Sequence, residues 1–326
     1  METLVLTEDE VKSAIYRLGV ESIMNSVERA FRSLAEGDAQ MPPKSYIIAE
    51  NGDFRAMPGL IGKDVGIKWV NSHPKNPEKY GLPSVMGLII YSDINTGYPL
   101  AIMDGTLITQ YRTGAAGGIA SKYLANPDSK TLGMIGCGMQ AITQFLFITH
   151  IMNIEHVKLY DVKPENAERL KSFILQTNPD CRVEITQIKD VCDADILVTT
   201  TPSRTPVVKN EWISEGTHIN AIGADAEGKQ ELDPEILKRA KIVVDEMEQA
   251  IHSGEINVPF KSGIISENDI HGELGEVITG TKPGRESKDE ITVFDSTGLA
   301  VQDIAVAGEI YRFALKHDLG RMVRFV

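Results

Sequence analysis

Apolar residues recur at helical spacing near the start of the chain, between Ile23 and Leu34. Thr7 and Glu10 form a capping-box pair ahead of this stretch, and Gly37 supplies a stop signal after it. The pattern therefore predicts that the chain opens with a helix.

Short runs of β-strand composition follow Pro43. They are KSYIIAE, DFRAMP, VGIKWVN, VMGLIIYS and YPLAIMD, and the last two are joined through DINTG, which is typical of a hairpin turn. Turns rather than helices separate these runs, so we expect an antiparallel sheet. A helix from about Thr106 to Leu124 should follow. Each glycine in its TGAAGG segment costs about 1 kcal/mol relative to alanine, so tight helix packing or the close approach of a backbone or ligand must compensate.

The hydrophobic pattern changes near Ser129, where short apolar runs begin to alternate with helical segments. The runs are TLGMIG, HVKLYD, VEIT, DILVTTT, THINAIG and KIVVDE, which predict βαβ units and a six-stranded parallel sheet. ITVFDSTG adds a strand and turn, and residues 299–316 form a final helix. We therefore expect an α/β protein in which a Rossmann domain, residues 129–298, is inserted into an α+β domain, residues 1–128 plus 299–326.

Composition narrows the class of protein. The 326 residues are 42% hydrophobic and 24% charged, as in an ordinary globular protein. The formal net charge of −13 would repel nucleic acid and anionic membranes, so neither is expected as a partner. The N-terminus lacks the features of a signal peptide, and a cytoplasmic protein is expected. Cys137, Cys181 and Cys192 are widely spaced, which indicates reduced thiols with neither disulfides nor a metal site.

The segment from Gly136 to Ala141 has the GxGxxA spacing of a dinucleotide-binding turn. Gly136 would make the tight turn, and Gly138 would let the backbone approach a pyrophosphate at the helix N-terminus. Asp161 ends the next strand, where an acid hydrogen-bonds the ribose hydroxyls and disfavours a 2′-phosphate. We therefore expect NAD rather than NADP, with Lys163 softening the preference. A cofactor-free Rossmann-like domain is the alternative.

Two further segments should lie at the carboxyl edge of the parallel sheet, where ligands bind. Among the residues of these segments, Asp225 is the candidate for a catalytic acid or base. The alternatives are a helix cap or a solvated loop acid. The segments are VTTTPS, with Thr200 and Thr201, and NAIGAD, with Ile222, Gly223 and Ala224.

Lys44, Arg55 and Lys68 are single cations in otherwise apolar strands of the first domain. They form either a solvated face or a small cationic pocket for a carboxylate. His73 and His218 are more typical of structural histidines than of catalysts.

Five ordered motifs together resemble the ornithine cyclodeaminase/mu-crystallin family, and most of all its branch of archaeal alanine dehydrogenases. They are KWVNSHPKNP, GYPLAIMDGTLITQYRTGAAGG, IGCGMQA, HINAIGAD with GKQEL, and VFDSTGLAVQD. The resemblance implies a homodimer in which the first domain binds substrate and dimerises through its antiparallel sheet. It also implies NAD-dependent, reversible oxidative deamination of L-alanine to pyruvate and ammonia.

The resemblance further implies roles for individual residues. Lys44, Lys68 and Arg112 would hold the carboxylate of the amino acid or 2-oxo acid, and Lys68 would also exchange protons. Asp225 would be the general acid or base. The nucleotide would be contacted by Arg112, Met139, Gln140, Asp161, Lys163, Lys229 and Ser296.

Arg55 departs from the family pattern, because ornithine cyclodeaminases carry a glutamate there to hold the distal ammonium of ornithine. Two like charges ~4 Å apart repel by ~4 kcal/mol at an effective dielectric constant of ~20. Arg55 in the substrate pocket should therefore favour a short, neutral side chain. The alternatives are an ornithine or lysine cyclodeaminase, a ketimine reductase, and a crystallin-like protein that binds NAD(P) without turnover.

Overall fold

The computed structural model describes residues 2–325, which fall into two compact units. Within the described residues, unit 1 comprises residues 2–112 and 299–325, and unit 2 comprises Thr113–Gly298. The first boundary therefore lies inside helix α3 (Thr106–Leu124) rather than at the expected position between residues 128 and 129.

The second half of α3 belongs to unit 2 because it packs tightly on α4 (Met139–Ile151). A Cβ added to Gly114 would come within 2.7 Å of Thr143, and one added to Gly117 would overlap the side chain of Gln144. Asn220 also donates hydrogen bonds to the Gly117 carbonyl and to Ser121 Oγ, at 3.2 and 2.9 Å. Helix packing thus explains the glycine-rich segment.

Unit 1 is built on an eight-stranded sheet with the order β16-β1-β7-β6-β5-β4-β2, in which β3 also pairs with β4. The pairs from β2 to β7 are antiparallel, as expected. The terminal strands were not predicted: β1 pairs with β7 in parallel, and β16 is antiparallel to β1. They have four and three residues, too few to produce a clear alternation. The strands are β1 (Thr3–Leu6), β2 (Ala39–Gln40), β3 (Ser45–Ala49), β4 (Gly52–Ile61), β5 (Asp64–Ser72), β6 (Val85–Asp93), β7 (Pro99–Asp104) and β16 (Arg321–Val323).

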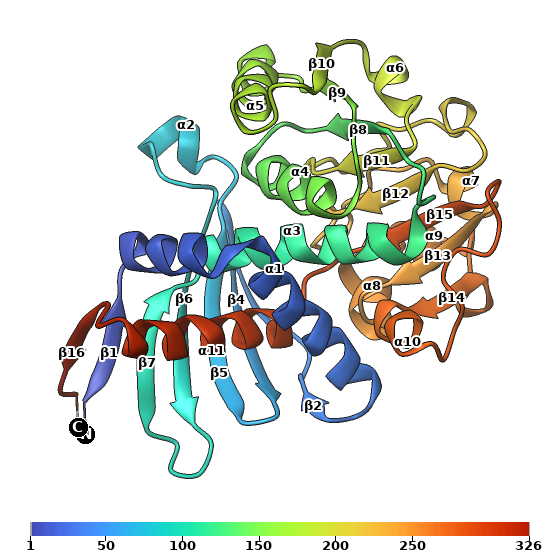
Figure 1. Cartoon of the computed structure of the whole chain (residues 1–326). Coiled ribbons are helices and arrows are strands. Elements are labelled where there is room, and N and C mark those ends of the chain that lie inside the picture. The colour runs from blue at the N-terminus through green and yellow to red at the C-terminus, as the bar shows by residue number, and fades with distance from the viewer. Residues whose placement is uncertain (1, 326) are drawn as a thin grey trace. The chain divides into compact units, whose positions relative to one another are not determined.

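Helices α1 (Glu8–Ala35) and α11 (Ala300–Lys316) pack against each other, and α11 crosses β4 and β5 (Figure 1). Helix α1 is interrupted at Gly19, whose φ of +79° lies in the left-handed region that favours glycine. A short helix, α2 (Asn76–Tyr80), lies between β5 and β6.

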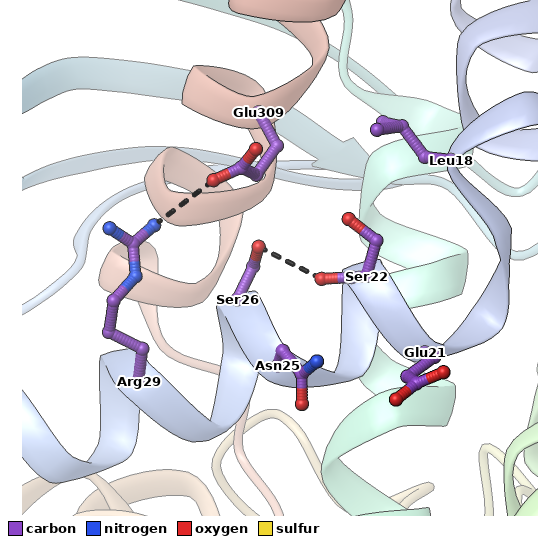
Figure 2. A pocket seen from close by; sticks show the side chains of 7 residues that line it. All are labelled: Leu18, Glu21, Ser22, Asn25, Ser26, Arg29 and Glu309. Atoms are coloured by element: carbon purple, nitrogen blue, oxygen red, sulfur yellow. Dashed lines mark hydrogen bonds and ion pairs between the residues drawn. The ribbon is translucent and has the colours of Figure 1, made fainter.

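An open hollow of about 560 Å³ over α1 and Glu309 contains none of the predicted site residues (Figure 2).

The sheet of unit 1 has one buried and one exposed face. Met57 and Ile89 are buried, whereas Trp69, Leu88 and Ile90 on the opposite face remain 45%, 54% and 41% exposed. Trp69 pairs directly with Leu88 across β5 and β6. An exposed apolar face of this kind marks an interaction surface.

Unit 2 contains a parallel sheet with the order β10-β9-β8-β11-β12-β15-β13-β14. The predicted parallel Rossmann sheet is confirmed, but it has eight strands. The four-residue strand β14 was not predicted, and β15 inserts between β12 and β13. The strands are β8 (Thr131–Ile135), β9 (His156–Tyr160), β10 (Arg182–Ile185), β11 (Ile196–Thr199), β12 (His218–Ala221), β13 (Ala240–Val244), β14 (Ile270–Glu273) and β15 (Ile291–Asp295).

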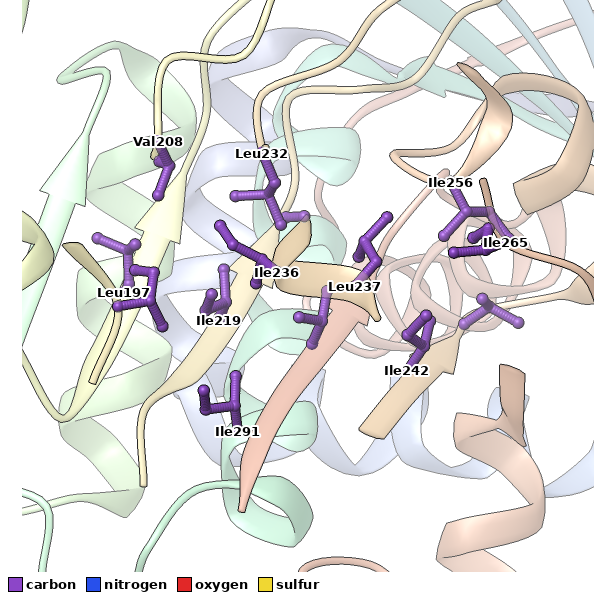
Figure 3. Close-up of a cluster of buried hydrophobic side chains, with 14 of the residues drawn as sticks. Leu197, Val208, Ile219, Leu232, Ile236, Leu237, Ile242, Ile256, Ile265 and Ile291 are labelled. Atoms are coloured by element: carbon purple, nitrogen blue, oxygen red, sulfur yellow. The ribbon is translucent and has the colours of Figure 1, made fainter. Parts of the chain in front are cut away.

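Burial of aliphatic side chains stabilises this sheet. Leu197, Ile219, Leu232 and Ile242 are fully buried in one cluster (Figure 3). The remaining helices of unit 2 are α5 (Pro164–Thr177), α6 (Ile188–Cys192), α7 (Pro234–Leu237), α8 (Met247–Ser253), α9 (Asn257–Lys261) and α10 (Leu274–Thr279), with 3₁₀ turns at Asn210–Trp212 and Glu267–Asp269. Throughout residues 2–325, no helix is both long and apolar enough to cross a lipid bilayer.

Candidate active site

A buried ionic cluster joins three elements of unit 1. Lys68 on β5 lies with its Nζ 2.6 Å from Asp303 Oδ2 on α11 and 3.2 Å from Thr109 Oγ1 on α3. Arg112 Nε donates to the other oxygen of Asp303 at 3.1 Å. Lys68 is 1% exposed and Asp303 is fully buried. The solvated-face interpretation of Lys68 is therefore wrong, because its ammonium is buried against a carboxylate and a second cation.

Strand geometry explains this position. Successive side chains of a strand point to opposite faces, so Lys68 and Val70 face the helices while Trp69 faces away. Burial lowers the pKa of Lys68 to about 7; Asp303 opposes this shift, while the charges of Arg112 and Lys44 add to it. At neutral pH Lys68 thus populates both its ammonium and amine forms, as a proton-transfer group requires.

Arg55 lies on β4, facing the same side of the sheet as Met57, and is 6% exposed. Its Nε and Nη2 donate to the two carboxylate oxygens of Asp53, at 2.6 and 3.1 Å. Its guanidinium also lies 5.5 Å from the centre of the Tyr46 ring. The expectation of an uncompensated cation at Arg55 is therefore corrected, because a bidentate carboxylate offsets its charge.

The predicted dinucleotide turn has the required backbone in unit 2. Gly136 adopts a φ of +87°, and a Cβ there would lie 3.0 Å from Thr200 Oγ1. Gly138 caps α4, and a Cβ there would meet nothing within 4 Å. Space for a ligand therefore lies at the N-terminus of this 13-residue helix, where backbone N–H groups and the helix dipole favour phosphate.

Asp161 follows β9, and its carboxylate accepts hydrogen bonds from the backbone N–H groups of Cys137 and Lys163, both at 2.8 Å. These two bonds fix the acid beside the glycine turn. Its position matches the one from which an acid binds the adenosine ribose in Rossmann domains.

Two predicted nucleotide contacts, Gln140 and Ser296, have buried polar atoms that find no hydrogen-bond partner within residues 2–325: Gln140 Oε1 and Ser296 Oγ. A buried polar atom left unsatisfied costs about 1–3 kcal/mol. A bound dinucleotide would supply donors and acceptors, so these residues fit the cofactor. Met139, the first residue of α4, is 54% exposed at the same helix end.

Asp225 lies in the loop after β12, where Lys229 Nζ is 2.5 Å from its Oδ1 and 3.5 Å from the Gly223 carbonyl. The next helix begins at Pro234 with Asp233 as its cap, so the helix-cap interpretation of Asp225 is wrong. The Asp225 side chain is 30% exposed. Asp225 is thus an ion-paired acid that a ligand could reach.

The loops after β11 and β12 pack closely together. A Cβ at Gly223 would overlap the backbone of Thr201. The structure therefore brings together the loop residues predicted from VTTTPS and NAIGAD: Thr200, Thr201, Ile222, Gly223, Ala224 and Asp225, with Lys229.

Sequence reasoning missed the carboxylate partners of the cations. Asp303 stands among apolar residues in AVQDIAVAG, a signal for a buried charge that could have been used. Asp53 is two residues from Arg55, so both belong to the same face of one strand.

The structural interpretation of His218 is consistent with its contacts. It lies buried between Thr292 Oγ1 and Asn220 Oδ1, at 2.9 and 3.1 Å, and burial lowers its pKa to about 3. Cys137, Cys181 and Cys192 are free and buried. Within residues 2–325, no cluster of His, Cys, Asp and Glu is arranged to hold a metal ion.

Asp295, at the end of β15, is fully buried, and burial raises its pKa to about 8. The negative charges of Asp245 and Glu231 add to this shift, whereas backbone N–H groups of Glu255 and Ile256 oppose it. In the unfolded chain an aspartate ionises near pH 4. Protonated Asp295 therefore contributes fully to the free energy of unfolding below about pH 4, and this contribution is lost as the pH rises through 8.

Asp295→Asn should therefore raise the melting temperature at pH 8.5 by at least about 2 °C. The amide stays neutral, so the variant avoids the cost of a buried negative charge at this position. The gain should shrink as the pH falls toward 5. Thermal unfolding of both proteins across this pH range measures it. A gain that is the same at every pH would contradict the raised pKa.

Known proteins resemble this chain over its whole length. A profile of the ornithine cyclodeaminase/mu-crystallin family matches residues 1–318. Alanine dehydrogenase of Archaeoglobus fulgidus is 54% identical over 325 residues, covering 100% of this chain and 99% of that protein. The structure of an archaeal alanine dehydrogenase dimer with bound NAD has 54% identity and a TM-score of 0.97, with both chains covered completely.

A reductase resembles the chain almost as well. The structure of Thermococcus litoralis Δ1-pyrroline-2-carboxylate reductase with NADH and L-proline is 40% identical, with a TM-score of 0.95, over 98% of this chain and 100% of that one. The profile match and these full-length similarities lead to one assignment. The chain belongs to the ornithine cyclodeaminase/mu-crystallin family.

Proposed function

We propose that the protein is an NAD-dependent L-alanine dehydrogenase that interconverts alanine with pyruvate and ammonia. The buried cluster of Lys68, Arg112 and Asp303 carries the proposal, because it concentrates donors for a small carboxylate beside a lysine that titrates near neutral pH. The full-length identity of 54% to an alanine dehydrogenase supports the choice of substrate.

Bound NAD would supply the redox chemistry by accepting a hydride from the substrate α-carbon. Lys68, Arg112 and Lys44 would bind the substrate carboxylate, and this anion would raise the pKa of Lys68 by favouring its ammonium form. Lys68 could then take up a proton as substrate binds and return it later. Asp225, paired with Lys229, would transfer protons to and from the water and ammonia that are exchanged.

The cofactor would be held by the glycine turn, by Asp161 and by the polar atoms that lack partners. Gly136 and Gly138 would admit the pyrophosphate, and Asp161 would bind the ribose hydroxyls. The other proposed contacts are Arg112, Met139, Gln140, Lys163, Thr200, Thr201, Ile222, Gly223, Ala224, Lys229 and Ser296.

The exposed apolar face formed by Trp69, Leu88 and Ile90 supports a homodimer. Such a face is a liability on a monomer, and a second copy would cover it with an identical apolar surface. The archaeal alanine dehydrogenase of similar structure is a dimer. An NAD-dependent enzyme of amino-acid metabolism with three free thiols is best suited to the cytoplasm, where we place it.

The second candidate is a Δ1-pyrroline-2-carboxylate reductase, which is favoured by the structure that is 40% identical to this chain. That substrate also offers a carboxylate next to a carbon–nitrogen double bond. A binding protein without turnover is less well supported, because a buried lysine with a pKa of about 7 costs stability without aiding cofactor binding.

The direct test of the proposed function is a steady-state assay of the purified protein with pyruvate, ammonium and NADH. We expect NADH oxidation that requires both pyruvate and ammonium, with alanine as the product. If the protein binds NADH but shows no turnover, the alternative of a crystallin-like protein that only binds the cofactor would be favoured.

Asp161→Ser should relax the preference for NAD over NADP, because it removes the charge that repels a 2′-phosphate. Comparing kcat/KM for the two cofactors in both proteins measures this. The expected change is about tenfold or more in the ratio of the two values, equivalent to about 1.4 kcal/mol. Equal use of NAD and NADP by the unmodified protein would contradict the role of Asp161.

A further inference from the structure

Three fully buried carboxyl groups at the carboxyl end of the parallel sheet have no part in the proposed chemistry. They belong to Glu231, Glu255 and Asp295. Glu231 follows the loop that carries Asp225, Glu255 lies between α8 and α9, and Asp295 ends β15. Burying several carboxyl groups together is costly, so their hydrogen bonds must offset a substantial penalty.

Glu231 joins the ends of two neighbouring strands. Its Oε1 accepts a hydrogen bond from the Thr201 N–H at 2.6 Å, and its Oε2 accepts from Thr199 Oγ1 at 2.8 Å and from the Gly223 N–H at 2.9 Å. Thr199 ends β11, while Gly223 follows β12 and precedes Asp225 by two residues. One carboxylate thus satisfies backbone donors of both loops.

Glu255 holds Glu231 in turn. Its carboxylate accepts hydrogen bonds from the backbone N–H groups of Glu231, at 2.9 and 3.0 Å, and of Leu232, at 2.7 Å. Asp295 Oδ2 accepts from the Ile256 N–H at 3.1 Å, which fixes the segment that carries Glu255. The contacts form a continuous chain from β15 to the loops after β11 and β12.

The three carboxyl groups differ in their hydrogen-bond donors. Burial raises the pKa of each, and the negative charge of Glu231 raises the pKa of Glu255 further. Glu231 has three donors from the two loops, which favour its ionised form, whereas Asp295 retains its proton to about pH 8. The hydrogen-bond geometry shows that one carboxylate serves all three donors.

The strand order indicates which part of a dinucleotide these loops would meet. The order reverses between β8 and β11, and a dinucleotide spans such a switch point with one half on each side. Asp161 follows β9, so the adenosine half would lie on the side of β8 and β9. The loops after β11 and β12, with Thr201, Gly223 and Asp225, lie on the side of the nicotinamide half.

We propose that Glu231, held by Glu255, is a positioning residue that fixes the two loops of the nicotinamide half-site and thereby places Asp225. The inference rests on the proposed use of NAD. Glu231 need not touch the cofactor, since it acts through the backbone of Thr201 and Gly223.

The test compares NADH with ADP-ribose as ligands of Glu231→Gln. ADP-ribose keeps the adenosine half, the pyrophosphate and the second ribose but lacks the nicotinamide ring. An amide has one acceptor oxygen, and its NH₂ group would face a backbone N–H, so at least one loop loses its partner. A buried backbone donor left without a partner destabilises the loop that carries it. We therefore expect NADH binding to weaken about tenfold or more and kcat to fall at least as much, while ADP-ribose affinity stays within about twofold.

Glu273→Gln is the matched control. Glu273 is a partly buried carboxylate that also accepts a backbone hydrogen bond, from the Met247 N–H at 2.9 Å, but it lies on the edge strand β14 and binds neither loop. Its variant should keep both affinities and kcat. If Glu231→Gln fails to fold, as judged by thermal unfolding, Glu255→Gln replaces it and should show the same selective loss, because Glu255 holds the Glu231 backbone.

The outcomes separate the inference from the proposed function. An unmodified protein that binds neither NADH nor ADP-ribose would overturn both. If the unmodified protein binds both ligands, two results overturn the positioning role alone: equal weakening of both ligands, which indicates a merely structural role, or no change in NADH affinity and kcat. Selective loss of NADH affinity and kcat supports it.

Discussion

Lys68→Met should lower kcat/KM for alanine by about 10³-fold or more while NADH binding changes little. The substitution removes a partner of the substrate carboxylate, worth about 1.5–3 kcal/mol, and a proton-transfer group, worth about 10²–10⁴ in rate. Methionine fills most of the volume of the buried side chain, and Asp303 keeps its bond to Arg112. Steady-state kinetics and fluorescence titration with NADH measure the two effects.

Lys63→Met provides the control, since Lys63 is an exposed lysine in the turn between β4 and β5. Its activity should match that of the unmodified protein. Near-normal turnover by Lys68→Met would remove Lys68 from the mechanism, whereas loss of NADH binding together with activity would indicate general unfolding.

Asp225→Asn should reduce kcat about 10²–10⁴-fold, the usual contribution of a positioned acid or base. The amide keeps the size of the side chain but cannot accept a proton from the reacting groups. Lys229 loses its carboxylate partner, yet both side chains are partly exposed, so water can solvate the ammonium and folding should be affected little. Single-turnover kinetics with NADH, pyruvate and ammonium would locate the loss in the chemical step.

Glu227→Gln is the matched control for this loop, because Glu227 pairs with Lys261 at the protein surface. We expect its kcat to be unchanged. An Asp225→Asn variant with more than about a third of normal activity would be incompatible with general acid–base catalysis by Asp225.

The sequence predicted those parts of the fold that repeat a pattern over enough residues. The strands from β3 to β7 and the six apolar runs of unit 2 have the composition of β-strands and are separated by turn or helical segments. The antiparallel and parallel sheets that they form were expected correctly. Strands β1, β14 and β16 have three or four residues and lie outside the regular alternation of apolar runs with helical segments, which revealed the equally short strands β10, β11 and β12. The interruption of α1 at Gly19 was missed because one glycine within a helical pattern is also compatible with an unbroken helix.

The candidate site was predicted in part because its motifs fix residue types but not partners. Lys68 and Arg112 were identified, but the carboxylate that joins them, Asp303, is 235 positions from Lys68. The network around Glu231 was missed for the same reason. Tertiary packing brings distant residues together, and the local pattern of apolar residues does not indicate which of them pair.

Asp53 changes the argument about substrate selectivity. The predicted penalty on a second substrate ammonium assumed an unpaired Arg55, whereas both oxygens of Asp53 bond to its guanidinium. The repulsion of an ornithine side chain should therefore be smaller than ~4 kcal/mol. The oxygens of Asp53 are nevertheless occupied by Arg55, so they are poorly placed to replace the glutamate that holds the distal ammonium in cyclodeaminases.

The central claim is that the substrate is alanine, and one measurement tests it most directly: product analysis of the purified protein in parallel reactions. These contain NADH with pyruvate and ammonium, NADH with Δ1-pyrroline-2-carboxylate, and NAD with ornithine. We predict efficient formation of alanine, less proline from the cyclic imine, and little or no proline from ornithine. Efficient proline formation from either substrate, with pyruvate and ammonium inert, would contradict the claim and assign the protein to the reductases or cyclodeaminases of its family.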